Sequence, residues 1–218
     1  MRTRIYISVI LLSIALLTRA QQSNSFISGF ERTMPSITLG AQRTVWIHIP
    51  NSNAGNKNTG KEHYPVIYLL DGDANFNSVV SITEFMSNAG LCPPMIVVGV
   101  LHLARMTDLT FGTDKGMPGI VGNGEKFMLY VEKELMPYIE LNYPTASYII
   151  FIGHSVGGLT VVNTLIHHPN LFNAYVSFDG ALWWNNQQIV TEAKTTLANK
   201  NYKGKTLFMA LANRIGKR

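Results

Sequence analysis

The pentapeptide GHSVG at residues 153–157 constrains the fold of this chain more than any other segment. The short apolar run at residues 148–152 precedes it and is typical of a strand, whereas residues 157–168 have the composition of a helix. A serine at a sharp strand-to-helix turn is held in a strained conformation that exposes its hydroxyl, while flanking glycines let the two elements approach closely. The pattern therefore predicts a nucleophile elbow at Ser155, and a purely structural glycine turn is the weaker interpretation.

Strand-like and helix-like patterns alternate along the rest of the chain. Residues 66–70 and 95–100 are near-continuous apolar runs, as expected for strands that are buried on both faces. Further strands are predicted at residues 43–49, 174–178 and 206–211. This alternation favours an α/β fold, a mostly parallel sheet with helices on both faces. Right-handed crossovers then place the functional loops at the carboxyl ends of the strands.

A long helix is predicted between residues 125 and 141. Apolar residues recur there at every fourth position, so the helix should lay one stripe against the sheet, formed by Phe127, Val131, Leu135 and Ile139. Pro137 lies within this segment and predicts a kink. A polar helix is predicted at residues 187–200.

Two other segments are expected to be irregular. Residues 51–61 are polar and glycine-rich and lie between two predicted strands, which indicates a solvated hairpin loop. Residues 21–34 are expected to be a loosely held start of the mature chain.

The first twenty residues predict a secretory signal peptide, which leaves residues 21–218 as one domain. Arg2 and Arg4 precede an apolar stretch of about 13 residues, and the segment ends at the small residue Ala20. Because a membrane-spanning helix needs roughly 20 apolar residues, we expect a secreted or periplasmic protein with no stable membrane insertion after cleavage. A retained N-terminal anchor is the alternative.

Composition excludes several classes of function. The net charge of +5 comes from the two ends, since residues 21–213 carry 12 basic and 13 acidic side chains, so no nucleic-acid-binding surface is predicted. Cys92 is the only cysteine and cannot form an internal disulfide. No Cys/His pair has metal-ligand spacing, so we expect no metal site.

Acyl transfer by a serine needs backbone donors for the oxyanion, a base, and a group that orients the base. The N–H of Val156 should supply one donor, and the loop after the strand at 66–70 should supply another from Gly72 or Asp73. An ordinary Asp-Gly turn is the alternative for that loop. Asp179 follows the strand at 174–178 and is the candidate acid, although a capping or turn role is at least as plausible.

The base is harder to place, because the histidine of this type of triad follows its partners in the sequence and no histidine lies beyond His168. His154 adjoins the nucleophile, but an elbow usually points this side chain away from the hydroxyl, so it is a candidate for substrate binding. His102 follows a predicted strand and is expected to line the pocket.

These residues resemble the esterase group of α/β-hydrolases that includes the enterobactin (siderophore) esterases and the esterase D-like enzymes. The resemblance extends from about Thr44 to Ala212. It rests on the stretches YPVIYLLDG at 64–72, IVVGV at 96–100 followed by Arg105 and DLT at 108–110, EKELMPYI at 132–139, FIGHSVGG at 151–158 and LWW at 182–184.

The resemblance implies an α/β-hydrolase fold and the hydrolysis of carboxylic esters by a Ser/His pair, usually with an acid and without a cofactor. Arg105 matches an arginine of the family's pocket loop, while Thr107 stands where a second arginine is expected, which weakens the case for a highly charged or catecholate substrate. Trp183 and Trp184 would form apolar walls near the acyl site, with core packing as the alternative for one of them.

Members of this family continue past the strand that is predicted to end here near Ala212. They add a loop with an acid, a final strand, a loop with the catalytic histidine and a closing helix. We therefore expect residues 21–218 to be C-terminally incomplete, lacking the final strand and helix, with the catalytic histidine beyond residue 218. An acyltransferase and a catalytically inactive, hydrolase-like binding protein are the two alternative functions, and nothing predicts the oligomeric state.

Overall fold

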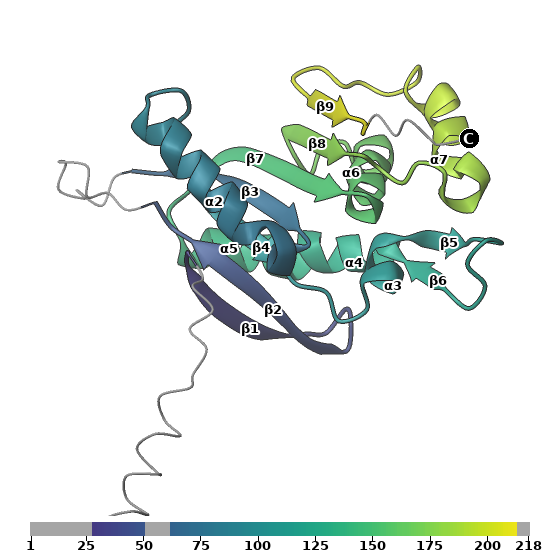
Figure 1. Ribbon diagram of the computed structural model, residues 1–218, viewed down its shortest axis with the longest axis horizontal. Helices are drawn as coiled ribbons and strands as arrows, with labels where there is room; N and C mark the ends of the chain where they lie inside the picture. The colour runs from purple at the N-terminus through teal and green to yellow at the C-terminus, as the bar shows by residue number, and fades with distance from the viewer. Residues whose placement is uncertain (1–27, 51–61, 213–218) are drawn as a thin grey trace, which may run out of the picture.

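Residues 28–50 and 62–212 are described by the computed structural model, and in them the predicted elbow lies near the middle of a seven-stranded sheet (Figure 1). The predicted signal peptide lies outside the described residues. The strand order is β1-β2-β4-β3-β7-β8-β9. The strands are β1 (Phe30–Ser36), β2 (Ala41–His48), β3 (Tyr64–Leu70), β4 (Ile96–Val100), β7 (Thr145–His154), β8 (Ala174–Phe178) and β9 (Thr206–Ala210).

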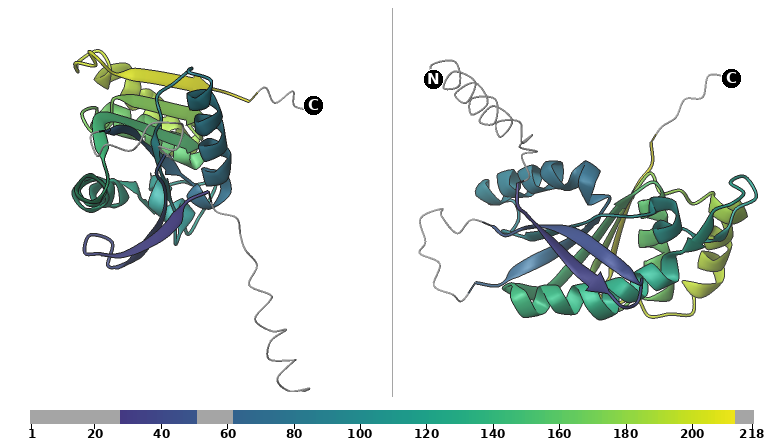
Figure 2. Two further views of the ribbon diagram at one scale, coloured as in Figure 1. Left: turned by 90° about the vertical axis from the view of Figure 1, so that its left-hand side faces the viewer. Right: turned by 90° about the horizontal axis from the view of Figure 1, so that it is seen from below.

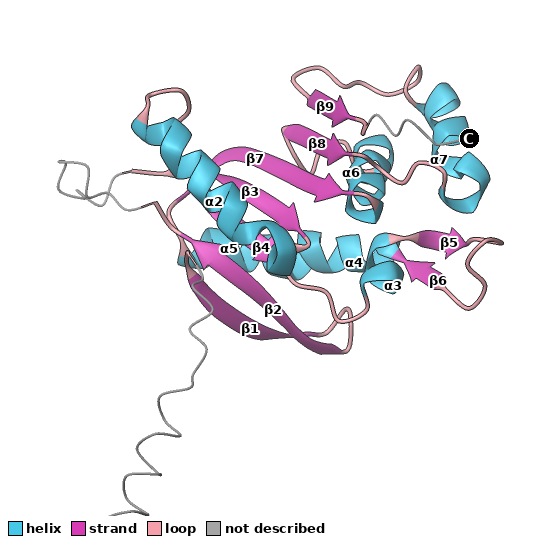
Figure 3. Cartoon of the chain, viewed as in Figure 1, coloured by secondary structure: helices cyan, strands magenta, loops and turns pink. Residues whose placement is uncertain are grey.

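The sheet is mostly parallel, which confirms the predicted fold class. Strands β4, β3, β7, β8 and β9 run parallel to one another, and only β1 and β2 are antiparallel to their neighbours. A small two-stranded sheet, β5 (Phe111–Thr113) with β6 (Val121–Asn123), lies beyond the carboxyl ends of the parallel strands, beside α3 (Arg105–Leu109) (Figure 3).

Helices cover both faces of the sheet (Figure 2). Helix α2 (Gly72–Asn88) packs on one face, where its Phe76 and Val80 contact Ile67 and Leu69 of β3. The opposite face of β3, with Val66, Tyr68 and Leu70, is covered by the continuous helix of α4 (Gly124–Tyr130), η2 (Val131–Leu135) and α5 (Met136–Asn142), and by α6 (Val156–His167). Because side chains alternate across a strand, the unbroken apolar run of β3 fills two cores at once.

The helix of residues 124–142 contains a π-turn, η2, directly before Pro137. Positions four residues apart drift by about 40° per step around a regular α-helix, so the predicted stripe would leave the sheet. A π-turn has i→i+5 bonds and more residues per turn, which reverses part of this drift. All four stripe residues are at most 1% exposed: Phe127, Val131, Leu135 and Ile139.

The start of the described chain is more ordered than predicted. Residues 21–34 were expected to be loosely held, but β1 begins at Phe30 and pairs with β2 along its whole length. A tight turn closes the hairpin, since Gly40 has a φ of 67° and donates its N–H to Ser36 O at 2.9 Å. Pro35 is tolerated because β1 is an edge strand.

The expected hairpin between β2 and β3 is wrong. β2 pairs with β4, and β3 lies between β4 and β7. Strand β3 has parallel neighbours on both edges, and β2 pairs antiparallel with the outer edge of β4. The loop at residues 51–61 lies outside the described residues. Within the described part of the chain, no helix is long and apolar enough to cross a membrane.

Candidate active site

Ser155 stands between β7 and α6 with a φ of 56° and a ψ of −117°. Only a few residue types adopt a positive φ without strain, and serine is not among them. Backbone bonds on both sides hold this conformation. The Ser155 N–H donates to Phe178 O at 2.9 Å, and Ser155 O accepts from the N–H groups of Leu159 at 3.0 Å and Ala181 at 2.8 Å.

Glycines are required around the elbow because backbone segments touch there. A Cβ on Gly153 would lie 2.4 Å from the carbonyl carbon of Gly157, and a Cβ on Gly158 would lie 2.8 Å from Cα of Gly180. Backbone atoms cannot move aside as a flexible side chain can, so these positions admit no larger residue without a shift of the elbow.

Two helix starts lie at this edge of the sheet. Val156 is the first residue of α6, and Gly72 and Asp73 are the first two of α2. The first N–H groups of a helix have no partner within the helix and carry partial positive charge. Strands β7 and β3 are parallel neighbours, so the two helices begin side by side, as the predicted oxyanion donors require.

Arg105 joins the two turns that carry these donors. Its Nε and one terminal nitrogen donate to the two oxygens of Asp71 at 2.5 and 2.7 Å, and the same terminal nitrogen reaches His154 O at 3.4 Å. Asp71 has a φ of 55° and caps α2, while His154 is the residue before the nucleophile. The hydrogen bond to Asp71 raises the pKa of Arg105, so the guanidinium stays charged.

A buried row of charged groups continues behind Asp71. The His102 ring is 3% exposed and lies 4.0 Å from an Asp71 oxygen and 3.6 Å from an Asp108 oxygen. Arg43 binds Asp108 through two nitrogens at 2.7 and 3.2 Å. Burial by itself would raise the pKa of Asp108, but the nearby His102 and the hydrogen bonds from Arg43 outweigh it and hold this pKa below its ordinary value.

The structure therefore places His102 in the interior rather than on an open pocket wall, where it could affect a ligand only through Asp71. Sequence reasoning assigned no role to Arg43 or Asp108. One signal was present, because Arg43 begins the predicted strand at residues 43–49, and an arginine that is buried there is expected to pair with a carboxylate.

Asp179 follows β8 directly, as predicted, and has a φ of 44°. Its N–H donates to Ala210 O at 2.6 Å, and its carboxylate accepts from the N–H of Ala212 at 3.3 Å. In this arrangement Asp179 caps the carboxyl end of β9. Its assignment as the catalytic acid stays a prediction.

All six histidines of the sequence lie in the described residues, and none bonds to the Ser155 hydroxyl. Five contact groups elsewhere: His48, His63, His102, His167 and His168. The sixth, His154, is exposed at the end of β7. No group of three or more His, Cys, Asp or Glu residues in the described ranges is arranged to hold a metal ion.

The two adjacent tryptophans differ in environment. Trp184 is 2% exposed and donates from its indole nitrogen to Phe111 O at 2.9 Å, so it belongs to the core. Trp183 is 51% exposed. It is the residue directly before α7 (Trp184–Thr196), and this helix lies on the side of the sheet where the parallel strands end (Figure 1).

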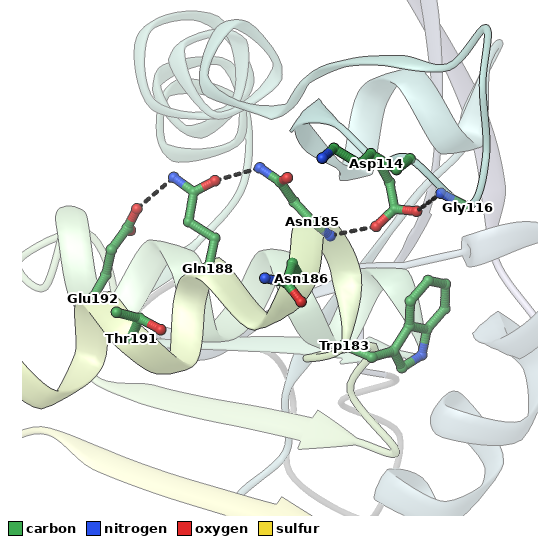
Figure 4. A pocket seen from close by; sticks show the side chains of 9 residues that line it. Asp114, Gly116, Trp183, Asn185, Asn186, Gln188, Thr191 and Glu192 are labelled. Carbon is green, nitrogen blue, oxygen red and sulfur yellow. Dashed lines mark hydrogen bonds between the residues drawn. The ribbon is translucent and has the colours of Figure 1, made fainter.

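A polar cleft of about 1060 Å³ opens beside Trp183, between α7 and the turn of residues 114–116 (Figure 4). Sequence analysis predicted a polar helix from residue 187. The helix instead includes a left-handed turn near its start, with a positive φ at Asn185, Asn186 and Gln187. The cleft was missed because it joins two segments about 70 residues apart, and local patterns carry no information on such pairing.

Together, the mostly parallel sheet, the strained serine and the helix starts beside it define an α/β-hydrolase. The family model described as "Putative esterase" matches residues 36–212, and the chain belongs to this family.

Two curated relatives are named as esterases. The chain is 30% identical over 220 residues to ferri-bacillibactin esterase BesA of Bacillus subtilis, covering 88% of this chain and 73% of that protein. It is 28% identical to the siderophore triacetylfusarinine C esterase of Aspergillus fumigatus, covering 66% of this chain and 53% of that protein. The chain thus spans only about half of the fungal relative.

The solved structures agree with the fold. An IroE-like serine hydrolase from Shewanella oneidensis is 33% identical, with a TM-score of 0.78 over 85% of this chain and 61% of that chain. Siderophore hydrolase EstA from Aspergillus nidulans has a TM-score of 0.74 at 19% identity, and this likeness concerns the fold alone.

Proposed function

We propose that this protein hydrolyses carboxylic esters through an acyl-enzyme on Ser155. The observation that carries the proposal is the strained Ser155 backbone at the elbow, with the starts of α6 and α2 beside it. Ser155 Oγ attacks the ester carbonyl while a base removes its proton. The bond to the alcohol then breaks, and the alcohol leaves with that proton. Water attacks the acyl-enzyme, releases the acid and restores the serine.

The developing oxyanion would be stabilised by the N–H of Val156 and by that of Gly72 or Asp73. The proposed base is a histidine beyond residue 218, since five of the six histidines in this chain contact groups elsewhere. Asp179 is the proposed acid. The proposed location is the periplasm or the outside medium, on the basis of residues 1–20.

Siderophore esters are the first substrates to test, because one relative is named a siderophore triacetylfusarinine C esterase and another a ferri-bacillibactin esterase. Two other functions remain under proposal. An acyltransferase would pass the acyl group to an added alcohol, and a binding protein would hold a ligand without turnover. Product analysis with and without an alcohol acceptor separates the first from hydrolysis.

The experiment begins with the gene, which should be sequenced beyond codon 218 and compared with the intact mass of the native protein. The full product is then tested with a short-chain aryl ester and with a fluorophosphonate label. We expect the label on Ser155, and a fall in kcat of at least about 10³-fold in Ser155→Ala. Ser81→Ala, on the exposed side of α2, is the matched control. Undiminished turnover by Ser155→Ala would falsify the proposal.

A further inference from the structure

The polar cleft opens close to the nucleophile. The Ala181 N–H donates to Ser155 O at 2.8 Å, which fastens the β8–α7 loop to the elbow. Trp183 is two residues further along, and two residues span at most about 7 Å. The cleft that Trp183 lines is therefore carried in part by a loop that is bonded to the backbone of the nucleophile.

Trp183 provides an exposed aromatic face to the cleft. More than half of this side chain is exposed, while the neighbouring Trp184 is buried and has its indole nitrogen bonded. Ligand pockets are commonly lined by aromatic side chains, and the exposed indole of Trp183 offers a rigid apolar face in the lining of this cleft. The apolar face of a flat or chair-shaped ring fits such a platform.

The opposite wall of the cleft is a chain of oriented polar groups (Figure 4). Asp114 accepts from the backbone N–H of Asn185 at 2.6 Å and from that of Gly116 at 2.7 Å. The Asn185 amide donates to Gln188, which donates to Glu192 at 2.6 Å. These hydrogen bonds fix the directions of the Asp114 carboxylate and of the Asn185 and Gln188 amides. Each of these groups keeps lone pairs or protons with which it can bind a ligand. Amides are both donors and acceptors, which matches hydroxyl groups of the same double capacity.

One further amide has unused capacity. The Asn186 side chain lines the cleft and makes no hydrogen bond to any group of the described residues. The left-handed turn of residues 185–187 sets the direction of this side chain. Strained backbone of this kind is frequent where a ligand is held.

The charge of the cleft excludes one class of occupant. Its ionisable lining residues are Asp114, Glu192 and Lys115, so carboxylates outnumber cations. Glu192 is shared with His167, whose Nε2 lies 2.9 Å from it. An anionic ligand would find one lysine and two carboxylates, which is unfavourable for its binding.

We propose that this cleft binds an uncharged sugar unit of the ester substrate, with the ring stacked on Trp183 and its hydroxyls bonded to Asn185, Asn186 and Asp114. That this sugar is part of the ester substrate rests on the proposed function. The binding of the sugar itself does not, since no step of hydrolysis is needed for it.

The test is isothermal titration calorimetry on the full chain carrying Ser155→Ala. Xylotriose is the neutral probe, and trigalacturonate is an anionic probe with the same number of rings. We expect saturable xylotriose binding with a Kd near or below about 1 mM, and at least tenfold weaker binding of trigalacturonate. Trp183→Ala should weaken xylotriose binding at least tenfold, and Asn186→Ala should weaken it severalfold.

Two matched variants control for general effects. Trp46→Phe alters a tryptophan on β2, and Asn142→Ala removes an amide bonded to Tyr138 O at the end of α5, so both should leave binding unchanged. The proposal is overturned by absence of saturable xylotriose binding up to about 10 mM, by binding that Trp183→Ala does not weaken, or by tighter binding of 2,3-dihydroxybenzoate than of xylotriose. If the protein hydrolyses esters but does not bind xylotriose, only the sugar-binding inference is wrong. If it binds xylotriose but hydrolyses no ester, only the proposed hydrolysis is wrong.

Discussion

The elbow and the polar cleft lie at the same edge of the sheet, but they are built in different ways. Backbone hydrogen bonds, glycine contacts and a buried row of charges hold the elbow. The cleft is formed by side chains of α7 and of the turn at residues 114–116, most of them partly exposed. The reacting group thus has a rigid support, while the walls that would contact a ligand are adaptable. This difference is expected when one scaffold serves many substrates.

This difference implies that substitutions at the elbow should reduce the free energy of unfolding, while substitutions in the cleft should change binding alone. Four experiments test the comparison on a common scale, urea denaturation at pH 7.

Asp108→Asn should have the largest effect, about 4 kcal/mol, because it leaves Arg43 buried without its carboxylate. The lowered pKa of Asp108 adds a pH dependence. Its stabilisation is present above the unfolded pKa of about 3.9 and is lost as the pH falls through the lower folded value. The difference between the two proteins should therefore shrink below about pH 4. Exposed Glu140→Gln is the control, and an equal loss there would contradict the assignment.

Gly153→Ala should cost about 3 kcal/mol, since its Cβ would overlap the backbone of Gly157. Gly204→Ala is the matched control. No atom lies within 4 Å of a Cβ at Gly204, but φ is 76°, so only the left-handed backbone cost of about 1 kcal/mol applies. Similar losses in both variants would mean that close approach at the elbow is not what requires a glycine there.

Arg105→Ala should reduce stability by only about 1 kcal/mol, because 40% of the side chain is exposed. Its main effect is expected on kcat, a fall of about tenfold with an unchanged KM for a neutral aryl ester, through misplacement of the oxyanion donors. Arg32→Ala, an exposed arginine over the Phe30 ring, is the control. A higher KM at constant kcat would instead indicate that Arg105 contacts substrate.

Trp183→Ala should have the smallest effect on stability, under about 0.5 kcal/mol, since the side chain is half exposed. Its neighbour is the natural contrast, because Trp184→Ala should cost about 4 kcal/mol through the cavity that it leaves. Equal losses at both positions would show that Trp183 packs into the core and would remove the distinction between elbow and cleft.

Sequence patterns predicted the parts of the molecule that depend on neighbouring residues. The strand at Ala174–Phe178 was placed with its observed bounds, and β2, β3, β4, β7 and β9 within a few residues, because most of these buried strands read as apolar runs. The strands β1, β5 and β6 were not predicted. The elbow at Ser155 was also predicted from neighbouring residues, because its glycines flank the serine directly in the sequence.

The rest depends on residues that are distant in the sequence. The position of β4 between β2 and β3, the ion pair of Arg43 with Asp108, and the bond from Asp114 to Asn185 each join separate segments. Nothing in a local window encodes such a pairing. Sequence also could not distinguish the two tryptophans, because the burial of Trp184 involves a distant segment, where its indole nitrogen donates to Phe111 O.

The π-turn at Val131–Leu135 has a consequence for the length of the gene. Removal of one residue from the π-turn would convert it into regular α-helical winding and leave the segment beyond it on the same face, because a π-turn accommodates one extra residue in a helix. Ile139, which is fully buried, would still face the sheet. Removal of one residue elsewhere in this helix would instead rotate the segment beyond it by about 100°. Over evolutionary time the π-turn should therefore tolerate the loss of a single codon far more readily than the rest of the helix.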